Sequence, residues 1–297
     1  MKAYNALPLC QQYQNEDILL SNIRPYLKKV WFADRKGGCS ADVLVLRGNK
    51  CDKYFLYYVI ASDRFINYVM SGIKGVKMPR GDKNQMEEYA FSIPTNMEQK
   101  RIAKFISILD ERIRLQNKII EKLESLIKGI ADKLFQTARE TKLLLELAPN
   151  ITSGTDKNGS GTIPLYGSTG IIGKVKNASQ KGNIVLVARV GTIGTVQYVK
   201  ESCGVSDNAL IVEAGEMTKY IYHFLKTYKF AHITSGTTQP LITASSLKKI
   251  AVPTYDIERQ TQIVLCLNIL ERKLDIEKQY LSDIAMMKQY LLHQMFI

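Results

Sequence analysis

The sequence predicts an α+β protein in which two similar mixed α/β domains are each followed by a long helix, with the two helices packed together. Three observations lead to this fold class. A heptad pattern of apolar residues follows Pro94, the same pattern returns after a constant shift of 161 residues, and the blocks that precede the two patterns also match. We therefore divide the chain into a first domain (1–96), a first helix (97–140), a second domain (141–254) and a second helix (255–297).

The first predicted helix carries apolar residues at steps of four and three from Met97 to Phe135, and Gln116 fills the one polar place. This spacing predicts a helix with a narrow stripe that packs against a partner helix. At about 1.5 Å per residue the helix would span roughly 60 Å, longer than an ordinary globular helix. The stripe on this helix consists of Ile102, Ile106, Leu109, Ile113, Ile120, Leu123 and Ile127.

The partner stripe is predicted on the second helix, where the pattern recurs. One place differs, because Ile127 falls on Lys288, and we expect the neighbouring Met287 to cover the stripe there. Two unrelated amphipathic helices are the alternative, since such stripes are common. Agreement over a whole helix at one shift favours a repeat. The stripe on the second helix consists of Ile263, Leu267, Leu270, Leu274, Leu281 and Ile284.

The first domain is predicted to form short strands, one helix and a loop. The helix runs from Tyr54 to Met70, with Asp52 in the position of an N-cap. The loop 71–83 that follows is rich in glycine and in cations. The strands are predicted at 17–21, 30–33, 43–46 and 89–93.

Residues 141–254 repeat this plan at a shift of 166, which pairs Ile18 with Ile184. The segment Leu143–Gly182 has no counterpart in the first domain. At the same shift, the counterpart of the start of the second domain would lie before Met1. This pattern predicts that the chain begins partway into its first domain.

Composition bounds the function. The chain has 297 residues and a net charge of +13, of which the first domain carries +5 and the second +6 when Lys and Arg are counted against Asp and Glu. This distribution favours nucleic acid or another polyanion as a partner of both domains, with a basic soluble surface as the alternative. No apolar run approaches a membrane span, and five scattered cysteines and three histidines indicate no metal site or disulfide framework. We expect a cytoplasmic protein without membrane contact.

No catalytic motif stands out. Gly167–Val175 is glycine-rich, but its spacing is one residue too long for a phosphate-binding loop, and Val175 replaces the hydroxyl that would bind magnesium. We predict a strand-turn-strand segment there. Because no dinucleotide, zinc-protease or hydrolase motif occurs and acidic residues are scattered, we expect a chain with no cofactor, no metal and no chemistry of its own.

Two basic domains mounted on paired helices suit a protein that reads two places on one duplex. The loops 71–84 and 234–243 are the better candidates, because glycine and small polar residues permit close approach of the backbone. For any single residue the alternative is an ordinary solvated side chain. Lysines predicted to hold phosphate are Lys28, Lys74, Lys77 and Lys83. Side chains able to read base edges are Asn22, Arg24, Arg80, Asn84, Arg189 and Gln239. Lys174, Thr237 and Thr238 complete the predicted DNA-binding set.

Several short motifs accompany this plan. They are Pro94, Glu98-Gln99, Leu109-Asp110 and Leu134-Phe135 with a weaker echo from Pro253 to Phe296, Asp17 to Pro25, Met78 to Asp82, and Ile163 to Ser168. In this combination nearly the whole chain resembles the DNA specificity (S) subunit of type I restriction–modification systems.

The resemblance implies two target recognition domains in inverted orientation, joined by antiparallel helices that form a coiled coil. Each domain would read one half of a split target on double-stranded DNA. The helices would serve as a spacer and as a docking surface for two methyltransferase subunits, which use S-adenosylmethionine to methylate adenine. Restriction motor-nuclease subunits would join through them.

Two features depart from the family pattern. Glu258-Arg259-Gln260 replaces the usual Glu-Gln pair, and the first recognition domain lacks its front end. Its half of the target would then be read poorly or not at all, or a separate chain or recombination would supply the missing piece. A coiled-coil scaffold without sequence-specific DNA reading is the main alternative function. A chain that cuts or methylates DNA alone is disfavoured by the missing motifs.

Overall fold

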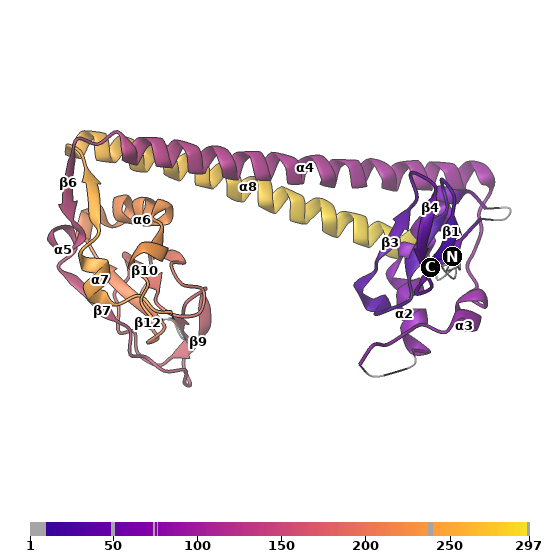
Figure 1. Ribbon diagram of the computed structural model, residues 1–297, viewed down its shortest axis with the longest axis horizontal. Helices are drawn as coiled ribbons and strands as arrows, with labels where there is room; N and C mark the ends of the chain where they lie inside the picture. The colour runs from indigo at the N-terminus through magenta and orange to yellow at the C-terminus, as the bar shows by residue number, and fades with distance from the viewer. Residues whose placement is uncertain (1–9, 49–50, 74, 76, 237–239, 296–297) are drawn as a thin grey trace, which may run out of the picture. The chain divides into compact units, whose positions relative to one another are not determined.

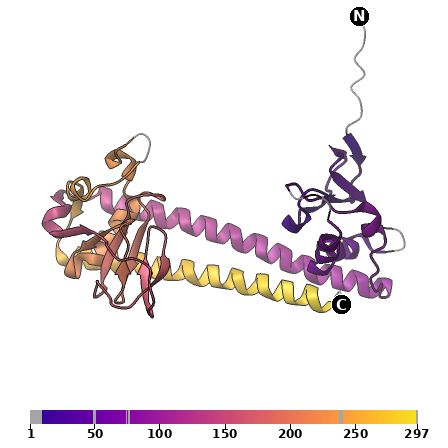
Figure 2. The same ribbon diagram turned by 90° about the horizontal axis from the view of Figure 1, so that it is seen from below.

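The computed structural model describes residues 10–48, 51–73, 75, 77–236 and 240–295. The chain forms a mixed α/β fold that divides into two compact units (Figures 1 and 2). Unit 1 comprises residues 1–119 and 277–297, and unit 2 comprises residues 120–276. Two long helices, α4 (Asn96–Gln136) and α8 (Ile257–Met295), each contribute one end to each unit. None of the described helices combines the length and the hydropathy that crossing a membrane would require.

The sheet of unit 1 confirms three of the predicted strands. Its order is β3-β2-β5, with both pairings antiparallel, and β2 in the centre is buried. Two further strands, β1 and β4, pair beside it. The strands are β1 (Cys10–Tyr13), β2 (Ile18–Ser21), β3 (Val30–Phe32), β4 (Gly37–Ser40) and β5 (Val43–Leu46).

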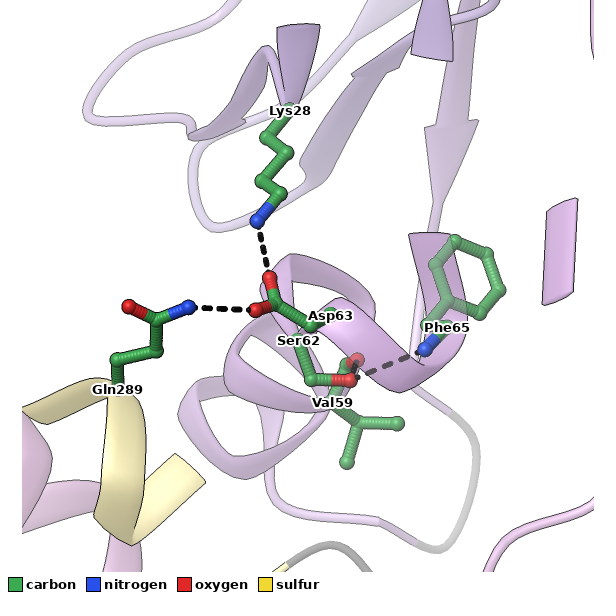
Figure 3. Close-up of polar contacts among 6 residues, drawn as sticks. All are labelled: Lys28, Val59, Ser62, Asp63, Phe65 and Gln289. Atoms are coloured by element: carbon green, nitrogen blue, oxygen red, sulfur yellow. Dashed lines mark hydrogen bonds and ion pairs between the residues drawn. The ribbon is translucent and has the colours of Figure 1, made fainter. Parts of the chain in front are cut away.

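The prediction of one helix from Tyr54 to Met70 is wrong, because two helices meet at Ser62. Ser62 adopts an extended backbone that ends α1 (Lys53–Ala61) and begins α2 (Asp63–Ser71). Its hydroxyl accepts the Phe65 amide at 3.3 Å and donates to the Val59 carbonyl at 2.6 Å (Figure 3). A Ser-Asp pair is a common helix start, so the apolar spacing concealed a local N-cap signal.

The predicted N-cap before α1 is confirmed, since Asp52 accepts the Tyr54 and Phe55 amides at 3.0 Å each. The predicted strand at 89–93 is wrong: those residues form no strand. Its match in unit 2, β14 (Ala251–Thr254), is a strand because it pairs with β6 (Glu140–Leu143). The remaining helices of unit 1 are a 3-10 turn, η1 (Pro25–Leu27), and α3 (Lys83–Glu87).

Unit 2 contains a larger set of strands, whose described pairings are antiparallel except for the parallel pair of β12 with β8. Its main sheet has the order β11-β10-β13-β7, and β10 is buried along its whole length. A second sheet, β12-β8-β9, contains the strand-turn-strand segment predicted for Gly167–Val175. The strands are β7 (Asn150–Ser153), β8 (Ile163–Tyr166), β9 (Ile171–Val175), β10 (Ile184–Ala188), β11 (Val196–Val199), β12 (Gly204–Val205) and β13 (Ala209–Glu213). The helices are α5 (Leu144–Leu147), α6 (Thr218–Thr227) and α7 (Ala244–Lys248), with 3-10 turns η2 (Gly215–Met217) and η3 (Phe230–Ile233).

In each unit the sheet packs on helices, and α4 packs on α1 in unit 1 and joins the core of the sheet in unit 2. In unit 1, Ile18 and Leu20 of β2 join a core with Phe65 of α2. In unit 2, β10, α6 and both long helices share one core, in which Phe135 of α4 packs edge-on against Tyr220 and Phe224. Figure 1 shows the α4 and α8 segments of unit 2 side by side above α6.

The helix starts repeat their capping chemistry at the 161-residue shift. Gln99 Nε2 donates to the Pro94 carbonyl at 2.8 Å, and Gln260 Nε2 donates to the Tyr255 carbonyl at 2.7 Å. Each amide therefore satisfies a carbonyl five residues before it. The same contact at both helix starts shows the internal repeat at the level of single atoms.

All thirteen residues of the predicted stripes are buried or half-buried. Within unit 1, Asp110, Arg112 and Gln116 of α4 contact α8. The expectation that Met287 covers the stripe is wrong, because Met287 is exposed and the half-buried Lys288 takes the inward place. Its ammonium pairs with Asp110, so a charge enters the contact with its counterion.

Candidate nucleic-acid interface

The central strands of the two units correspond at a shift of 167 residues, one residue more than the constant shift of 166 that the sequence comparison uses. In unit 1, Ile18 of β2 pairs with Leu46 of β5, and in unit 2, Val185 of β10 pairs with Val212 of β13. Leu46 and Val212 differ by 166, whereas Ile18 and Val185 differ by 167. Because side chains alternate between faces, this single residue decides which positions correspond.

At the corrected shift, Asn22 corresponds to Arg189, and each directly follows the central strand. The Asn22 amide donates to the Asp42 carbonyl at 2.8 Å, and the Arg189 amide donates to the Asn208 carbonyl at 3.0 Å. The constant shift of 166 would have paired Asn22 with the apolar Ala188 instead.

The two candidate loops approach these strand ends in the same way. Gly81 donates its amide to the Asn22 carbonyl at 3.3 Å, and Ile242 donates its amide to the Arg189 carbonyl at 3.0 Å. Gly81 and Ile242 differ by 161, the shift that also relates the long helices. The loop of each unit therefore meets the end of the central strand at one equivalent point.

The turns after the central strands differ in an informative way. Arg24 and Lys28 have positive φ values of 51°, while the corresponding residues in unit 2, Gly191 and Gly194, have φ values of 71° and 80°. Left-handed backbone suits glycine and costs most other residues on the order of 1 kcal/mol. Unit 1 thus holds two cations in a conformation that glycine would adopt without strain.

A cavity of about 570 Å³ lies beside the unit 1 loop. Asn22, Arg80 and Lys83 line it, and Arg80 pairs with Asp42 at 3.0 Å. The Arg24 amide donates to the Pro79 carbonyl at 2.8 Å, which holds the turn against the same loop. The cavity therefore brings together three of the predicted DNA-binding residues.

The loop passes Asn22 so closely that Gly81 has no space for a side chain. A Cβ at Gly81 would lie 2.2 Å from Met86 Cε, 2.7 Å from Val69 Cγ1 and 3.2 Å from Asn22 Oδ1. Contacts this short would displace the loop. Glycine at this position thus permits the close approach expected of the loop.

Lys28 is engaged within the protein. Its ammonium pairs with Asp63, and the second carboxylate oxygen of Asp63 accepts Gln289 Nε2 at 2.9 Å (Figure 3). The Lys28 ammonium is the main cause that holds the pKa of the Asp63 carboxyl below its usual value. A phosphate would compete with this carboxylate, so the predicted role of Lys28 stays a prediction.

Arg189 is held by one side of its guanidinium. Its Nη1 donates to Ser153 Oγ at 2.9 Å, and its Nε is buried without a hydrogen-bond partner among the described residues. Ser153 lies at the end of β7, a strand without a counterpart among the described residues of unit 1. Sequence reasoning missed Ser153, because no local motif connects it with Arg189.

The other predicted residues are placed less tightly. Lys77, Lys83 and Asn84 are exposed on or beside the unit 1 loop. Lys174 is exposed on β9, in the second sheet of unit 2. Lys74, Thr237, Thr238 and Gln239 lie outside the described residues.

A second apolar stripe, missed by sequence reasoning, runs beside the predicted one on each long helix. Its members directly precede positions of the first stripe and are exposed. They also obey the 161-residue shift, which is the signal that would have found them. We call this set the flank stripe; it consists of Ile108, Leu115, Ile119 and Leu126 on α4, and Ile269, Ile276, Tyr280 and Met287 on α8.

Comparison with known proteins identifies the family. Residues 3–125 and 143–286 match the family described as the type I restriction modification DNA specificity domain. The chain belongs to this family. Its two matched segments coincide with the two halves of the internal repeat.

Relatives agree with this assignment to the specificity domain family. The chain is 35% identical to the MjaVIII specificity subunit of Methanocaldococcus jannaschii over 106 residues, which cover 35% of this chain and 24% of that protein. It is 25% identical to the EcoDI specificity subunit of Escherichia coli over 129 residues, or 42% of this chain and 29% of that protein. The matched stretches thus span less than a third of these relatives.

The fold is similar to that of the S subunit of a type I restriction–modification system from M. genitalium. The TM-score is 0.66 at 19% identity, covering 97% of this chain and 84% of that one. A structure from work on assembly and conformational transition of the type I system gives a TM-score of 0.65 at 17% identity, covering 99% and 85%. These likenesses concern the fold.

Proposed function

We propose that this specificity-domain protein is a non-catalytic DNA-reading subunit that recognises a bipartite target on double-stranded DNA. One observation carries the proposal: in both domains, a loop meets the end of the central strand at the same point, through Gly81 and Asn22 or through Ile242 and Arg189. Both domains are basic, which favours a polyanionic partner. Two equivalent reading positions suit two half-sites.

We propose that residues 1–96 and 141–254 form the two recognition domains, and that 97–140 and 255–297 form the spacer helices. The helices would pair as an antiparallel coiled coil along the predicted stripes. In support, contact partners of Asp110, Arg112 and Gln116 on α8 are Lys288, Tyr280 and Glu277, whose numbers fall as those on α4 rise. A rigid pair of helices would fix the separation of the two half-sites.

The flank stripe is the proposed docking surface for two methyltransferase subunits, which restriction subunits would then join. Arg112 and Tyr280, both at flank positions, contact each other at 2.8 Å, so the stripes of the two helices face the same side in unit 1. An exposed apolar surface of this kind marks an interaction site. Because the stripe repeats on both helices, it offers two equivalent surfaces for two copies of one partner.

The first experiment is to purify the chain with and without its methyltransferase partner and to map the methylated adenines. Adenines within one split motif are the expected result, and randomly distributed marks would contradict DNA reading. Binding to duplex DNA should weaken steeply with salt, and Lys77→Ala or Lys83→Ala should each reduce the slope of log K against log salt by about 0.9. Lys118→Ala, on the exposed surface of α4, is the matched control.

Docking is tested separately by Leu115→Glu and its repeat mate Ile276→Glu. Each should reduce co-purification of the methyltransferase subunit, because each places a carboxylate within the flank stripe. Lys118→Glu and Gln279→Glu are matched controls, since these exposed positions are also repeat mates. Undiminished co-purification with both stripe variants would show that the partner binds elsewhere.

A coiled-coil scaffold without sequence reading is the second candidate, and the flank stripe is the observation that favours it. Such a scaffold would bind protein partners through the stripe while its DNA binding stayed weak and indifferent to sequence. A split methylation motif excludes this reading, whereas partner binding without any motif supports it.

A further inference from the structure

Two buried polar atoms without hydrogen-bond partners occupy one equivalent place in the two domains. Among the described residues, four buried side-chain oxygen or nitrogen atoms lack a partner: Asn22 Oδ1, Gln85 Oε1, Arg189 Nε and Thr254 Oγ1. Two of these four belong to the corresponding residues Asn22 and Arg189. Asn22 is only 6% exposed, so water cannot replace the missing hydrogen bond to its side-chain oxygen Oδ1.

An unpaired buried polar atom is unfavourable for folding, and native proteins keep few of them. Asn22 and Arg189 meet the fold's needs through their backbones, which bond Asp42 or Asn208 on one side and the loop on the other. An apolar side chain would leave all of these backbone bonds intact. The unpaired side-chain groups therefore point to a ligand that the free chain lacks.

The two side chains offer different chemistry. Asn22 presents a carboxamide, the group that makes paired hydrogen bonds with N6 and N7 of adenine in the major groove. Arg189 commits Nη1 to Ser153, which leaves the edge formed by Nε and Nη2. A guanidinium edge of this kind makes paired hydrogen bonds with O6 and N7 of guanine.

We infer that Asn22 and Arg189 are corresponding base-reading residues, Asn22 for an adenine in one half-site and Arg189 for a guanine in the other. The inference rests on the proposed function and adds to it the base class read at each position. It also assigns Ser153 as a positioning residue, because Ser153 fixes the orientation of the guanidinium.

The cavity beside Asn22 gives the route of access in unit 1. Lys83 lines the same cavity and supplies positive charge for the phosphate backbone, and Arg80, which pairs with Asp42, lines it too. Gly81 lies beside Asn22, since a Cβ at Gly81 would stand 3.2 Å from Asn22 Oδ1.

The test is selection of bound sequences from a pool of randomised duplex DNA by the full chain. The wild-type chain should select a split motif. Asn22→Asp should change one adenine of one half to cytosine, because a carboxylate accepts from cytosine N4 and no longer donates to adenine N7. Arg189→Gln should change one guanine of the other half to adenine, and Ser153→Ala should weaken that guanine preference several-fold.

Asn22→Leu serves as a second variant, because it removes the polar groups while it keeps four side-chain heavy atoms in the same branched arrangement. It should keep the thermal stability of the wild type and lose on the order of tenfold or more of its base preference at one position. Thr254→Val is the matched control, since it removes another unpaired buried oxygen away from both loops. It should select the wild-type motif.

The outcomes separate the two levels of the proposal. Unchanged motifs in Asn22→Asp and Arg189→Gln, beside a clear wild-type motif, overturn the residue assignment and leave the proposed function in place. A folded wild-type chain that selects no motif overturns the proposed function and the assignment together. A change confined to the half-site expected for each residue supports both.

Discussion

Gln116 and Glu277 contact each other across 161 residues, and 161 is also the shift that relates the two long helices. Gln116 Nε2 donates to the Glu277 backbone carbonyl at 3.2 Å and to its carboxylate. Each of these two residues is therefore the repeat mate of the other. Gln116 is 4% exposed, so the polar place in the predicted stripe is a buried contact with α8.

We therefore expect Gln116→Glu to destabilise unit 1, because it places a second carboxylate against Glu277 in a buried site. The free energy of unfolding in urea at pH 7 should fall by about 2 kcal/mol or more. The loss should shrink below about pH 4.3, where glutamate becomes protonated. Equal losses at pH 7 and pH 4 would show that charge repulsion is not the cause. Asn117→Asp, an exposed neighbour, is the control.

Lys288 and Asp110 form an ion pair in the helix contact, and Tyr58 of α1 donates its hydroxyl to the same carboxylate at 3.0 Å. Lys288→Met should lower the free energy of unfolding by about 1 kcal/mol, because it leaves Asp110 with less compensation. Asp110→Leu should cost less in this variant than in the wild-type chain, because no unpaired charge then remains, whereas Tyr58 loses its acceptor in both chains. Urea unfolding of the four chains measures this cycle, and additive losses would contradict the coupling.

The buried hydroxyl of Tyr58 predicts a loss of stability at alkaline pH. Burial, aided by Asp110, raises the pKa of the Tyr58 hydroxyl above its ordinary value. A group whose pKa is raised by folding contributes stability that is present below its unfolded pKa, about 10, and is lost as the pH rises. Unfolding free energy should therefore decline above about pH 10. Tyr58→Phe should lessen that decline while it costs about 1 kcal/mol at pH 7.

The buried imidazole of His223 predicts that unit 2 loses stability at acidic pH. Burial lowers the pKa of the His223 imidazole, an effect that the nearby Glu271 opposes, and its Nε2 lies 3.0 Å from Asn268 Oδ1. The folded chain resists protonation of this ring, so stability is present above the unfolded pKa of about 6.5 and is lost as the pH falls below it. The slope reaches at most about 1.4 kcal/mol per pH unit. His223→Gln should remove this slope, whereas His293→Gln, at an exposed position of α8, should retain it.

We expect the residue at position 24 to affect both the stability of the fold and the affinity for duplex DNA. Because Arg24 has a φ of 51°, Arg24→Gly relieves backbone strain and should raise the free energy of unfolding by a few tenths to about 1 kcal/mol. Greater freedom of the glycine in the unfolded chain reduces this gain. The same variant removes a cation beside the loop, so its affinity for duplex DNA should fall. Arg24→Ala separates the effects, since it loses the charge and keeps the strain.

The long-range organisation could be predicted from sequence, because a heptad pattern and a constant shift are strong periodic signals. The pattern placed the helix between Met97 and Phe135, and α4 runs from Asn96 to Gln136. The periodic pattern did not predict local breaks in the secondary structure. Ser62 divides a run of apolar residues through one extended backbone position, and 89–93 has the composition of a strand without a pairing neighbour.

The sequence picks out the candidate site as loops rather than as single residues. The sequence picked out the loop 71–84, and the structure brings its Gly81, Arg80 and Lys83 to the end of β2. The correspondence of Asn22 and Arg189 could not be predicted from the sequence, because it depends on strand register. The register of a strand is set by its cross-strand pairs, and a sequence comparison at one constant shift carries no information about those pairs.

That register has a practical consequence for anyone who exchanges recognition elements between the two halves. The hairpin of residues 18–32 holds 15 residues, and its true counterpart, 185–198, holds 14. A transplant cut at a uniform spacing would turn every side chain of the inserted strand to the opposite side and bury the wrong set. A transplant that drops one residue in the turn, where two glycines replace Arg24 and Lys28, keeps the inward-facing and outward-facing side chains in place.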